Sequence, residues 1–145
     1  MMVGTSSSAR ETAILVGLEH DGMSRWDVEE SLTELRQLAA TAGAEVVDTV
    51  VQKLGKPTAP FYIGKGKAEE VARRCGEKRA TSLIFDDELS PAQGRNLEKV
   101  THRKVLDRTQ LILDIFARRA RTREGRLQIE LAQLQYLLPR LTRMW

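Results

Sequence analysis

Cysteine and long apolar runs are scarce in this chain of 145 residues, and each shortage excludes a class of protein. Cys75 is the only cysteine, so no disulfide forms within the chain and a reducing compartment is expected. We interpret it as structural. No apolar run approaches the ~18 residues that span a bilayer, and the first ten residues lack the hydrophobic segment of a secretory signal. The sequence therefore predicts a soluble, cytoplasmic protein.

Catalytic and metal-binding patterns are also missing. His20 and His102 lie far apart in the sequence, with no cysteine or carboxylate at ligand spacing, so we predict no metal site. No serine or cysteine has a recognisable base partner. We therefore predict no catalytic residues and no enzymatic activity from this chain alone.

Strand and helix patterns alternate over the first hundred residues. Apolar or β-branched runs predict strands at residues 12–18, 44–54, 81–87 and 104–107. Helices are predicted between them, at residues 27–42, from Gly64 to about Gly76, and after Ser90, where Ser-Pro-Ala-Gln forms a capping box. This order is typical of an α/β domain with a small, mostly parallel sheet flanked by helices.

The chain from Val105 onward reads VLDRTQLILDIFARRARTREGRLQIELAQLQYLLPRLTRMW and predicts a helical hairpin. Apolar residues repeat at steps of four and three, as in the a/d seam of a coiled coil. The second limb contributes Leu127, Leu131, Leu134, Leu138 and Leu141. The first contributes Leu106, Thr109, Leu113, Phe116 and Ala120, of which Thr109 is the one polar member. We expect this seam to close an antiparallel coiled-coil hairpin whose limbs, of ~16–17 residues, reach about 25 Å.

These patterns divide the chain into three parts. Residues 1–11 are predicted to be a disordered tail, residues 12–107 an α/β domain and residues 108–145 the hairpin. Gly94, inside the third predicted helix, has no explanation in the sequence alone.

Charge is divided unevenly between these parts. From Arg103 onward ten Arg or Lys face four Asp or Glu, a net charge of +6, whereas the first 102 residues carry thirteen against sixteen, a net charge of −3. The turn of the hairpin holds Arg118, Arg119, Arg121, Arg123 and Arg126, with Glu124 as its only acid and Gly125 as its only helix breaker. Guanidinium groups bind phosphate bidentately and stack on bases. We therefore predict that this tip contacts nucleic acid, in preference to being a merely solvated face.

A second candidate site is the strand-to-helix turn formed by Gly64, Lys65, Gly66 and Lys67. Glycines and a helix N-terminus are suited to phosphate. However, a nucleoside-triphosphate loop requires Ser or Thr where Ala68 stands, and a dinucleotide fingerprint would require glycine at Glu69. We favour a tight turn and keep nucleotide binding as an alternative.

A third candidate is Asp86-Asp87-Glu88, at the carboxyl end of a predicted strand. Paired carboxylates there could hold magnesium. A receiver-type phosphoacceptor domain would, however, need its acidic pair after the first strand, where only Glu19 and Asp21 occur. We favour a polar loop that leads into the next helix.

Three stretches resemble the N-terminal part of the HflX family of ribosome-associated GTPases: FYIGKGKAEEVA, IFDDELSPAQGRNLEK and VLDRTQLILDIFARRARTREGRLQIELAQLQYLLPRL. With weaker similarity from Thr12 onward, the resemblance covers nearly the whole chain. Gly94 stands where the family generally has a larger residue. The P-loop, magnesium ligands and guanine-reading motif of the family's GTP-binding domain do not occur here, so we expect a chain truncated before that domain.

The resemblance implies that the α/β domain and hairpin dock on the large ribosomal subunit, with the tip arginines on 23S rRNA. It implies that the missing GTPase domain is a partner and uses GTP and magnesium to help dissociate stalled or stressed ribosomes. This chain itself needs no cofactor, although the family's association with adenine nucleotides adds interest to the turn at Gly64–Lys67. We expect a monomer. Two alternatives stay open: a regulatory nucleotide-binding domain that uses this turn, and an interaction module that pairs through the leucine seam.

Overall fold

A four-stranded parallel sheet forms the centre of the molecule. The computed structural model describes residues 11–140. Its strands are β1 (Glu11–Glu19), β2 (Ala44–Lys53), β3 (Ser82–Phe85) and β4 (Lys104–Asp107), in the order β2-β1-β3-β4. All three pairings are parallel. β1 is buried on both faces, which explains its nearly continuous apolar sequence. The predicted α/β class is confirmed.

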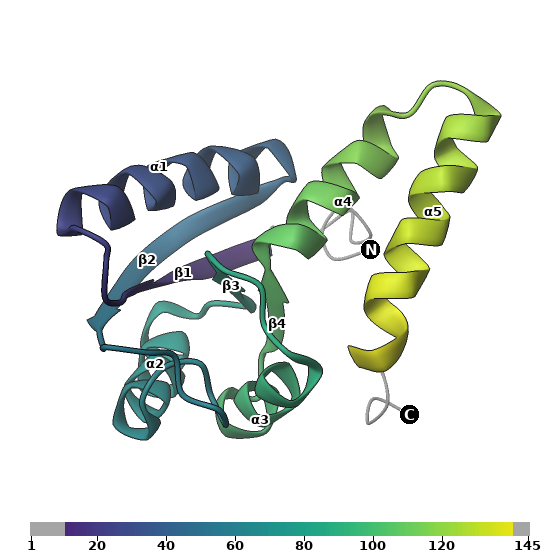
Figure 1. Cartoon of the computed structure of the whole chain (residues 1–145). Coiled ribbons are helices and arrows are strands. Elements are labelled where there is room, and N and C mark those ends of the chain that lie inside the picture. The colour runs from purple at the N-terminus through teal and green to yellow at the C-terminus, as the bar shows by residue number, and fades with distance from the viewer. Residues whose placement is uncertain (1–10, 141–145) are drawn as a thin grey trace.

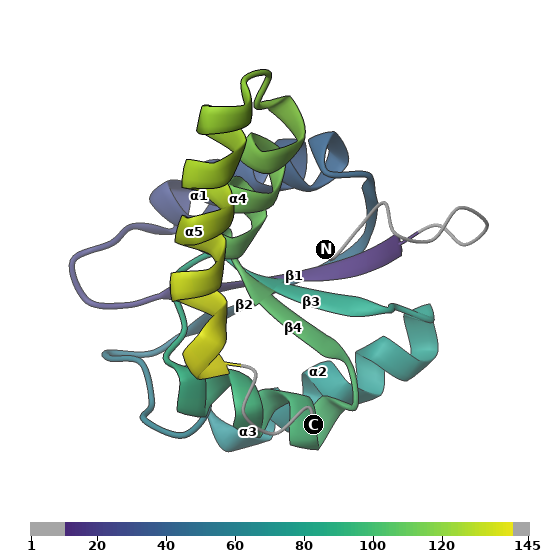
Figure 2. The ribbon, with the colours of Figure 1, turned by 90° about the vertical axis from the view of Figure 1, so that its right-hand side faces the viewer.

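Helices cover both faces of this sheet. They are α1 (Arg25–Thr41), α2 (Lys65–Lys78), α3 (Pro91–Thr101), α4 (Arg108–Arg119) and α5 (Arg123–Leu137), followed by a 3-10 turn, η1 (Leu138–Arg140). Figure 2 shows α1 and α4 on one side of the sheet and α2 and α3 on the other. α5 runs antiparallel to α4 and stands beside the body (Figure 1).

Two core layers follow from the alternation of side chains along the strands. Toward α1 and α4, Leu15 and Ile84 pack with residues that include Leu35 and Leu111. Toward α2 and α3, the neighbouring strand residues Ile14 and Phe85 pack with residues that include Val71 and Leu97. The capping box predicted at Ser90 is present, with Ser90 Oγ accepting a hydrogen bond from the Gln93 N–H at 3.1 Å.

The first limb of the hairpin begins inside the body. Leu106, which was expected in the seam, belongs to β4 and lies in the core. α4 starts at the next residue but one, and its Leu111 and Ile115 are buried against the sheet. The division at residue 107 therefore stays a prediction. The expected tail lies outside the described residues except for Glu11, which begins β1.

The predicted leucine seam does not close. Leu127, Leu131, Leu134 and Leu138 are 55%, 56%, 54% and 61% exposed, and α5 has no buried residue. Leu141 lies outside the described residues. The reason is the orientation of α4, which turns Leu111 and Ile115 toward the sheet and leaves Phe116 53% exposed. An apolar groove of about 930 Å³ remains between α5, α4, β4 and α3.

The limbs are also shorter than expected. α4 has 12 residues and α5 has 15, which correspond to about 18 and 22 Å of helix. Because the first half of α4 lies on the sheet, only its last turn and the tip project beyond the body (Figure 1).

Candidate nucleic-acid interface

A tight connection forms the tip of the hairpin. α4 ends at Arg119, Ala120 is extended, and Thr122 caps α5 by accepting a hydrogen bond from the Gly125 N–H at 2.9 Å. Gly125 is therefore not the helix breaker that the sequence suggested, because it lies in the first turn of α5. A Cβ at this position would lie only 2.8 Å from Thr122 Oγ1. The glycine leaves room for the cap.

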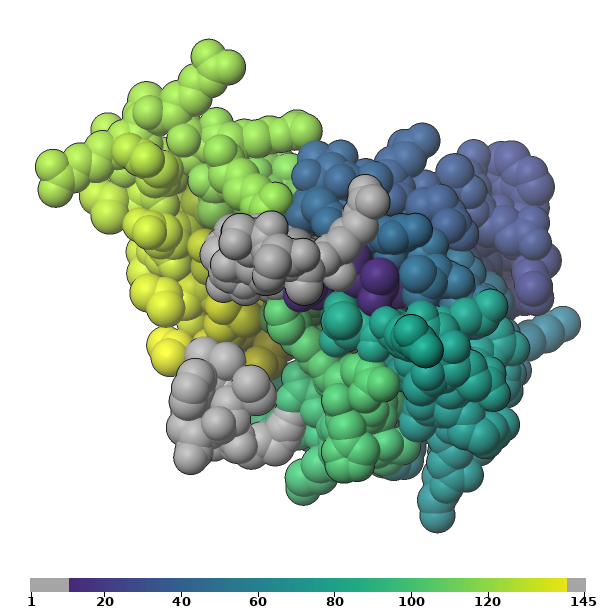
Figure 3. Space-filling view, turned by 180° about the vertical axis from the view of Figure 1, so that it is seen from behind, coloured from purple at the N-terminus to yellow at the C-terminus, as the bar shows by residue number. Residues whose placement is uncertain are grey.

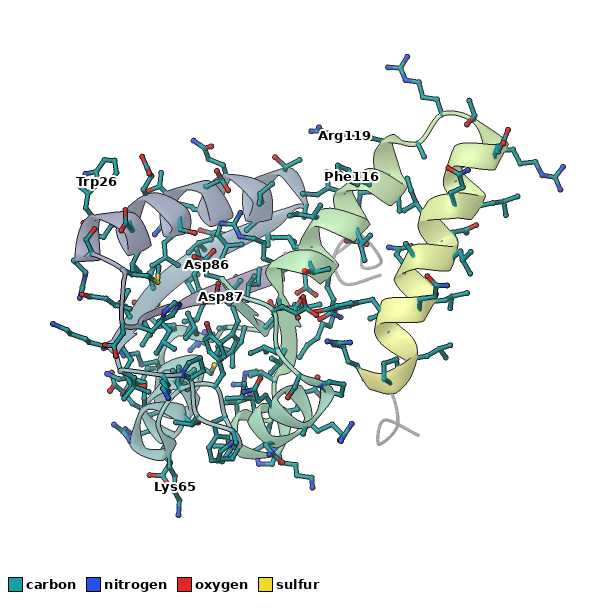
Figure 4. All side chains as sticks on the ribbon, viewed as in Figure 1. Trp26, Lys65, Asp86, Asp87, Phe116 and Arg119 are labelled. Carbon is teal, nitrogen blue, oxygen red and sulfur yellow. The ribbon has the colours of Figure 1, made fainter. Side chains whose placement is uncertain are left out.

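The five arginines predicted to bind nucleic acid are all exposed around this connection. Arg118 pairs with Asp114 at 3.7 Å. The side chains of the other four have no ion pair or hydrogen bond within residues 11–140: Arg119, Arg121, Arg123 and Arg126. Figure 4 labels Arg119 at the end of α4, and Figure 3 shows long side chains extending outward from the yellow-green tip. Four of the five positive charges at the tip thus have no acidic partner within residues 11–140.

Folding does not account for the placement of all these charges. Arg118 and Arg119 lie in the last turn of α4, where the helix dipole favours cations. Arg123 and Arg126 lie instead at the start of α5, where each cation is disfavoured by about 0.3–1 kcal/mol and only Glu124 compensates. A polyanion that approaches the tip would remove this cost.

The base of the hairpin is fixed by the buried carboxylate of Asp107. It accepts hydrogen bonds from the N–H groups of Leu89 and Gln110, both at 3.0 Å, and from the Tyr136 hydroxyl of α5. Burial, followed by this hydrogen bond to Asp107, raises the pKa of Tyr136. The guanidinium of Arg140 lies 3.7 Å from the centre of the Tyr136 ring and donates to the Leu89 carbonyl at 2.7 Å. These contacts hold α5 to the body.

Only one local feature of the sequence points to this anchor. An aspartate directly before a helix is a strong N-cap residue, and Asp107 is the N-cap of α4. Tyr136 had no comparable signal, because its partner is 29 residues away.

The acidic loop Asp86-Asp87-Glu88 is engaged by donors from the chain itself. Asp86 pairs with Arg108 at 2.8 Å, Asp87 accepts from the Tyr62 hydroxyl, and Glu88 lies 3.8 Å from Arg140. Arg108 also reaches Glu34 of α1 at 2.5 Å. These pairings favour the interpretation as a polar loop. They join α1, β3 and α4 around the base of the hairpin.

The turn at Gly64–Lys67 is the uncapped start of α2. Gly64 occupies the N-cap position without a side-chain hydrogen bond, and its N–H donates to Gln52 Oε1 at 2.8 Å. Lys67 Nζ pairs with Glu70 at 3.0 Å, whereas Lys65 is exposed and points away from the sheet (Figure 4). One of the two lysines is thus already engaged within the helix. Nucleotide binding at this turn stays a prediction.

No helix within residues 11–140 has both the length and the apolar character needed to cross a membrane. Together, the parallel sheet and the basic hairpin give the chain the form of an α/β body with a projecting helical arm. Comparison with known proteins identifies the class to which this form belongs.

The family described as "GTP-binding GTPase N-terminal" matches residues 29–117, and "GTP-binding GTPase Middle Region" matches residues 119–145. Curated relatives called GTPase HflX include those of Flavobacterium psychrophilum (47% identity over 135 residues), Lacrimispora saccharolytica (55% over 115) and Escherichia coli K12 (44% over 137). These alignments cover 93%, 79% and 94% of this chain and 33%, 27% and 32% of the relatives. The chain thus spans about a third of their length.

Solved structures agree. A mutation variant of SsGBP matches with a TM-score of 0.70 and 27% identity, over 92% of this chain and 41% of that one. A GTP-binding protein from the archaeon Sulfolobus solfataricus, in complex with GDP, matches with a TM-score of 0.65 and 28% identity, over 92% and 39%. The class is therefore that of the N-terminal and middle regions of GTP-binding GTPases. Within this class, the chain belongs to the HflX family.

Proposed function

We propose that this chain is a ribosome-binding region of an HflX-like GTP-binding protein, and that its basic tip contacts the 23S rRNA of the large subunit. The observation that carries the proposal is the group of four exposed arginines without an acidic partner, Arg119, Arg121, Arg123 and Arg126. They project from a body whose own charge is slightly negative. This arrangement directs the arm, and not the body, toward a polyanion.

GTP hydrolysis belongs, in this proposal, to the part of the relatives that this chain does not match. The pattern G-x-x-x-x-G-K-[ST] does not occur in its 145 residues. The chain supplies binding and orientation, and the GTP-binding part supplies the energy for ribosome dissociation or rescue.

Charge reversal at the tip tests the proposal. The variant Arg119→Glu/Arg121→Glu/Arg123→Glu should lose its association with purified large subunits at moderate salt, whereas the parent should bind with an affinity that falls steeply with salt concentration. Co-sedimentation over a salt series measures both. Circular dichroism should show an unchanged fold, because all three side chains are exposed.

A matched control places the same three charge reversals elsewhere. Lys56, Arg73 and Lys99 are exposed and without ion pairs in the described chain, on the loop before α2, on α2 and on α3. Their reversal to glutamate should leave most of the binding intact. If the tip variant sediments with large subunits as well as the parent does, the assignment of the tip is wrong.

The half-exposed leucines of α5 favour a second candidate function, in which the groove pairs with a second copy of this chain. Sedimentation equilibrium would then show concentration-dependent dimers that Leu131→Asp abolishes. A monomer at all concentrations would remove this candidate.

A further inference from the structure

The tip carries one large aromatic side chain next to its arginines. Phe116 is 53% exposed on the last turns of α4, although the spacing of apolar residues placed it in the hairpin seam. Leu111 and Ile115 lie on the buried side of this helix, and the Phe116 ring is left half-exposed. The chain therefore forgoes the free energy of burying half of an aromatic side chain.

The surroundings of Phe116 distinguish it from an ordinary exposed apolar residue. Residues three apart on a helix are neighbours, so Phe116 lies next to Arg119, and Figure 4 labels the two at the same end of α4. Arg119 has no acidic partner within residues 11–140. An aromatic face beside an uncompensated guanidinium is the combination that binds unpaired nucleotides, with the base on the ring and the phosphate on the cation.

We propose that Phe116 is a stacking platform for an unpaired RNA base and that Arg119 contacts the phosphate of the same nucleotide. This inference rests on the proposed function and makes it more specific, because it selects a single-stranded or looped RNA segment. In an A-form duplex the bases are stacked on one another and offer no free face to Phe116.

Trp26 supplies an internal comparison. It is 65% exposed at the start of α1, among the carboxylates of Asp27, Glu29 and Glu30. Phosphate is repelled from such a surface, so an exposed aromatic ring there is no nucleotide platform. Comparing Trp26 with Phe116 therefore separates the effect of an exposed aromatic ring from the effect of a positively charged neighbour.

The test uses an unstructured RNA of fifteen nucleotides and a duplex RNA of the same length as probes, with affinities measured by fluorescence anisotropy over a salt series. Removing the ring in Phe116→Ala should weaken binding to the single strand by about tenfold at every salt concentration, within the range of base stacking. The slope of log K against log salt should not change, because no charge is lost. Phe116→Leu, which retains an apolar side chain of similar size, should weaken binding likewise, and Phe116→Trp should not.

Two further variants complete the design. Arg119→Ala should reduce the salt slope by about one, and Trp26→Ala should bind as the parent does. Duplex affinity should be the same for Phe116→Ala and the parent. Single-strand binding that is unchanged in both Phe116→Ala and Phe116→Leu, or absent in the parent, would overturn the inference. Loss of large-subunit binding in the triple arginine variant would still support the proposed function in that case.

Discussion

The α/β body and the α5 arm both contain leucines and charged residues, but many of these side chains are buried or paired in the body, whereas most are exposed on the arm. In the body, α1 to α4 each bury side chains, and the carboxylates of Asp86 and Asp87 have partners from distant elements. α5 buries no residue, its leucines are half-exposed and its arginines lack acidic partners within residues 11–140. The body is therefore stabilised by its own contacts, whereas the arm leaves apolar and charged groups exposed.

α4 belongs to both regions and changes character along its length. Its first turns bury Leu111 and Ile115 in the sheet layer shared with α1, whereas its last turn carries Phe116 and Arg119 into solvent. The body thus sets the direction of the arm, and the polar cluster at Asp107 sets the position of α5 beside it. Three comparisons test this division, each between variants in the body and variants in the hairpin.

The largest contrast should come from the same substitution in the two regions. Leu111→Ala leaves a cavity in the core and should reduce the free energy of unfolding by about 2–5 kcal/mol. Leu131→Ala removes a side chain that is 56% exposed and should cost less than about 1 kcal/mol. Urea denaturation measures both. Equal losses would mean that α5 is packed as tightly as the body, and the distinction would fail.

A second, smaller effect is expected where the regions meet. Asp107→Ala removes the N-cap of α4 and the acceptor of the Leu89 N–H and the Tyr136 hydroxyl, so the free energy of unfolding should fall by about 3 kcal/mol. Tyr136→Phe should cost about 1 kcal/mol and increase amide hydrogen exchange chiefly in α5. Glu124→Ala, an exposed acid at the tip, is the control and should change stability by less than ~0.5 kcal/mol. If Tyr136→Phe instead increased amide hydrogen exchange equally in all elements, the hydrogen bond from Tyr136 to Asp107 would not be what holds α5 to the body.

The smallest changes in stability are expected at two glycines, and they should differ in sign. Gly94→Ala adds a methyl group where no atom lies within 4 Å, so it should stabilise α3 by about 0.5–1 kcal/mol. Gly125→Ala brings a Cβ to 2.8 Å from Thr122 Oγ1 and should cost about 1 kcal/mol by disturbing the cap of α5. The shift in thermal midpoint gives both signs. A stabilising Gly125→Ala would show that the cap at Thr122 is dispensable.

Much of the body was predictable because its signals are local. The apolar run that forms β1 and the Ser90 capping box identify their elements without knowledge of the rest of the chain. The hairpin was harder, because α4 is apolar at positions 111–113, 115 and 116. Such a sequence is compatible with more than one buried helical face. Leu113 lines the groove beside α5 as the predicted seam requires, whereas Phe116 is exposed.

The basic tip was predictable from the local sequence alone, because five arginines within nine residues are recognised without tertiary information. Its structural setting was not. Four of these arginines lack an acidic partner because of where the acids of the described chain lie. Phe116 is exposed because a different side of α4 packs against the sheet.

The sequence by itself determined the order of strands and helices, the capping box at Ser90, and the separation of a slightly acidic body from a basic arm, because each of these depends on neighbours a few residues apart. Only the tertiary structure decided which face of α4 is buried, how Asp107 holds α5, and how Arg108 reaches Ser31, 77 residues away in the chain. The physical reason is that burial and ion pairing are determined by groups that meet in space, and the packing of the sheet selects among faces that the sequence leaves equivalent.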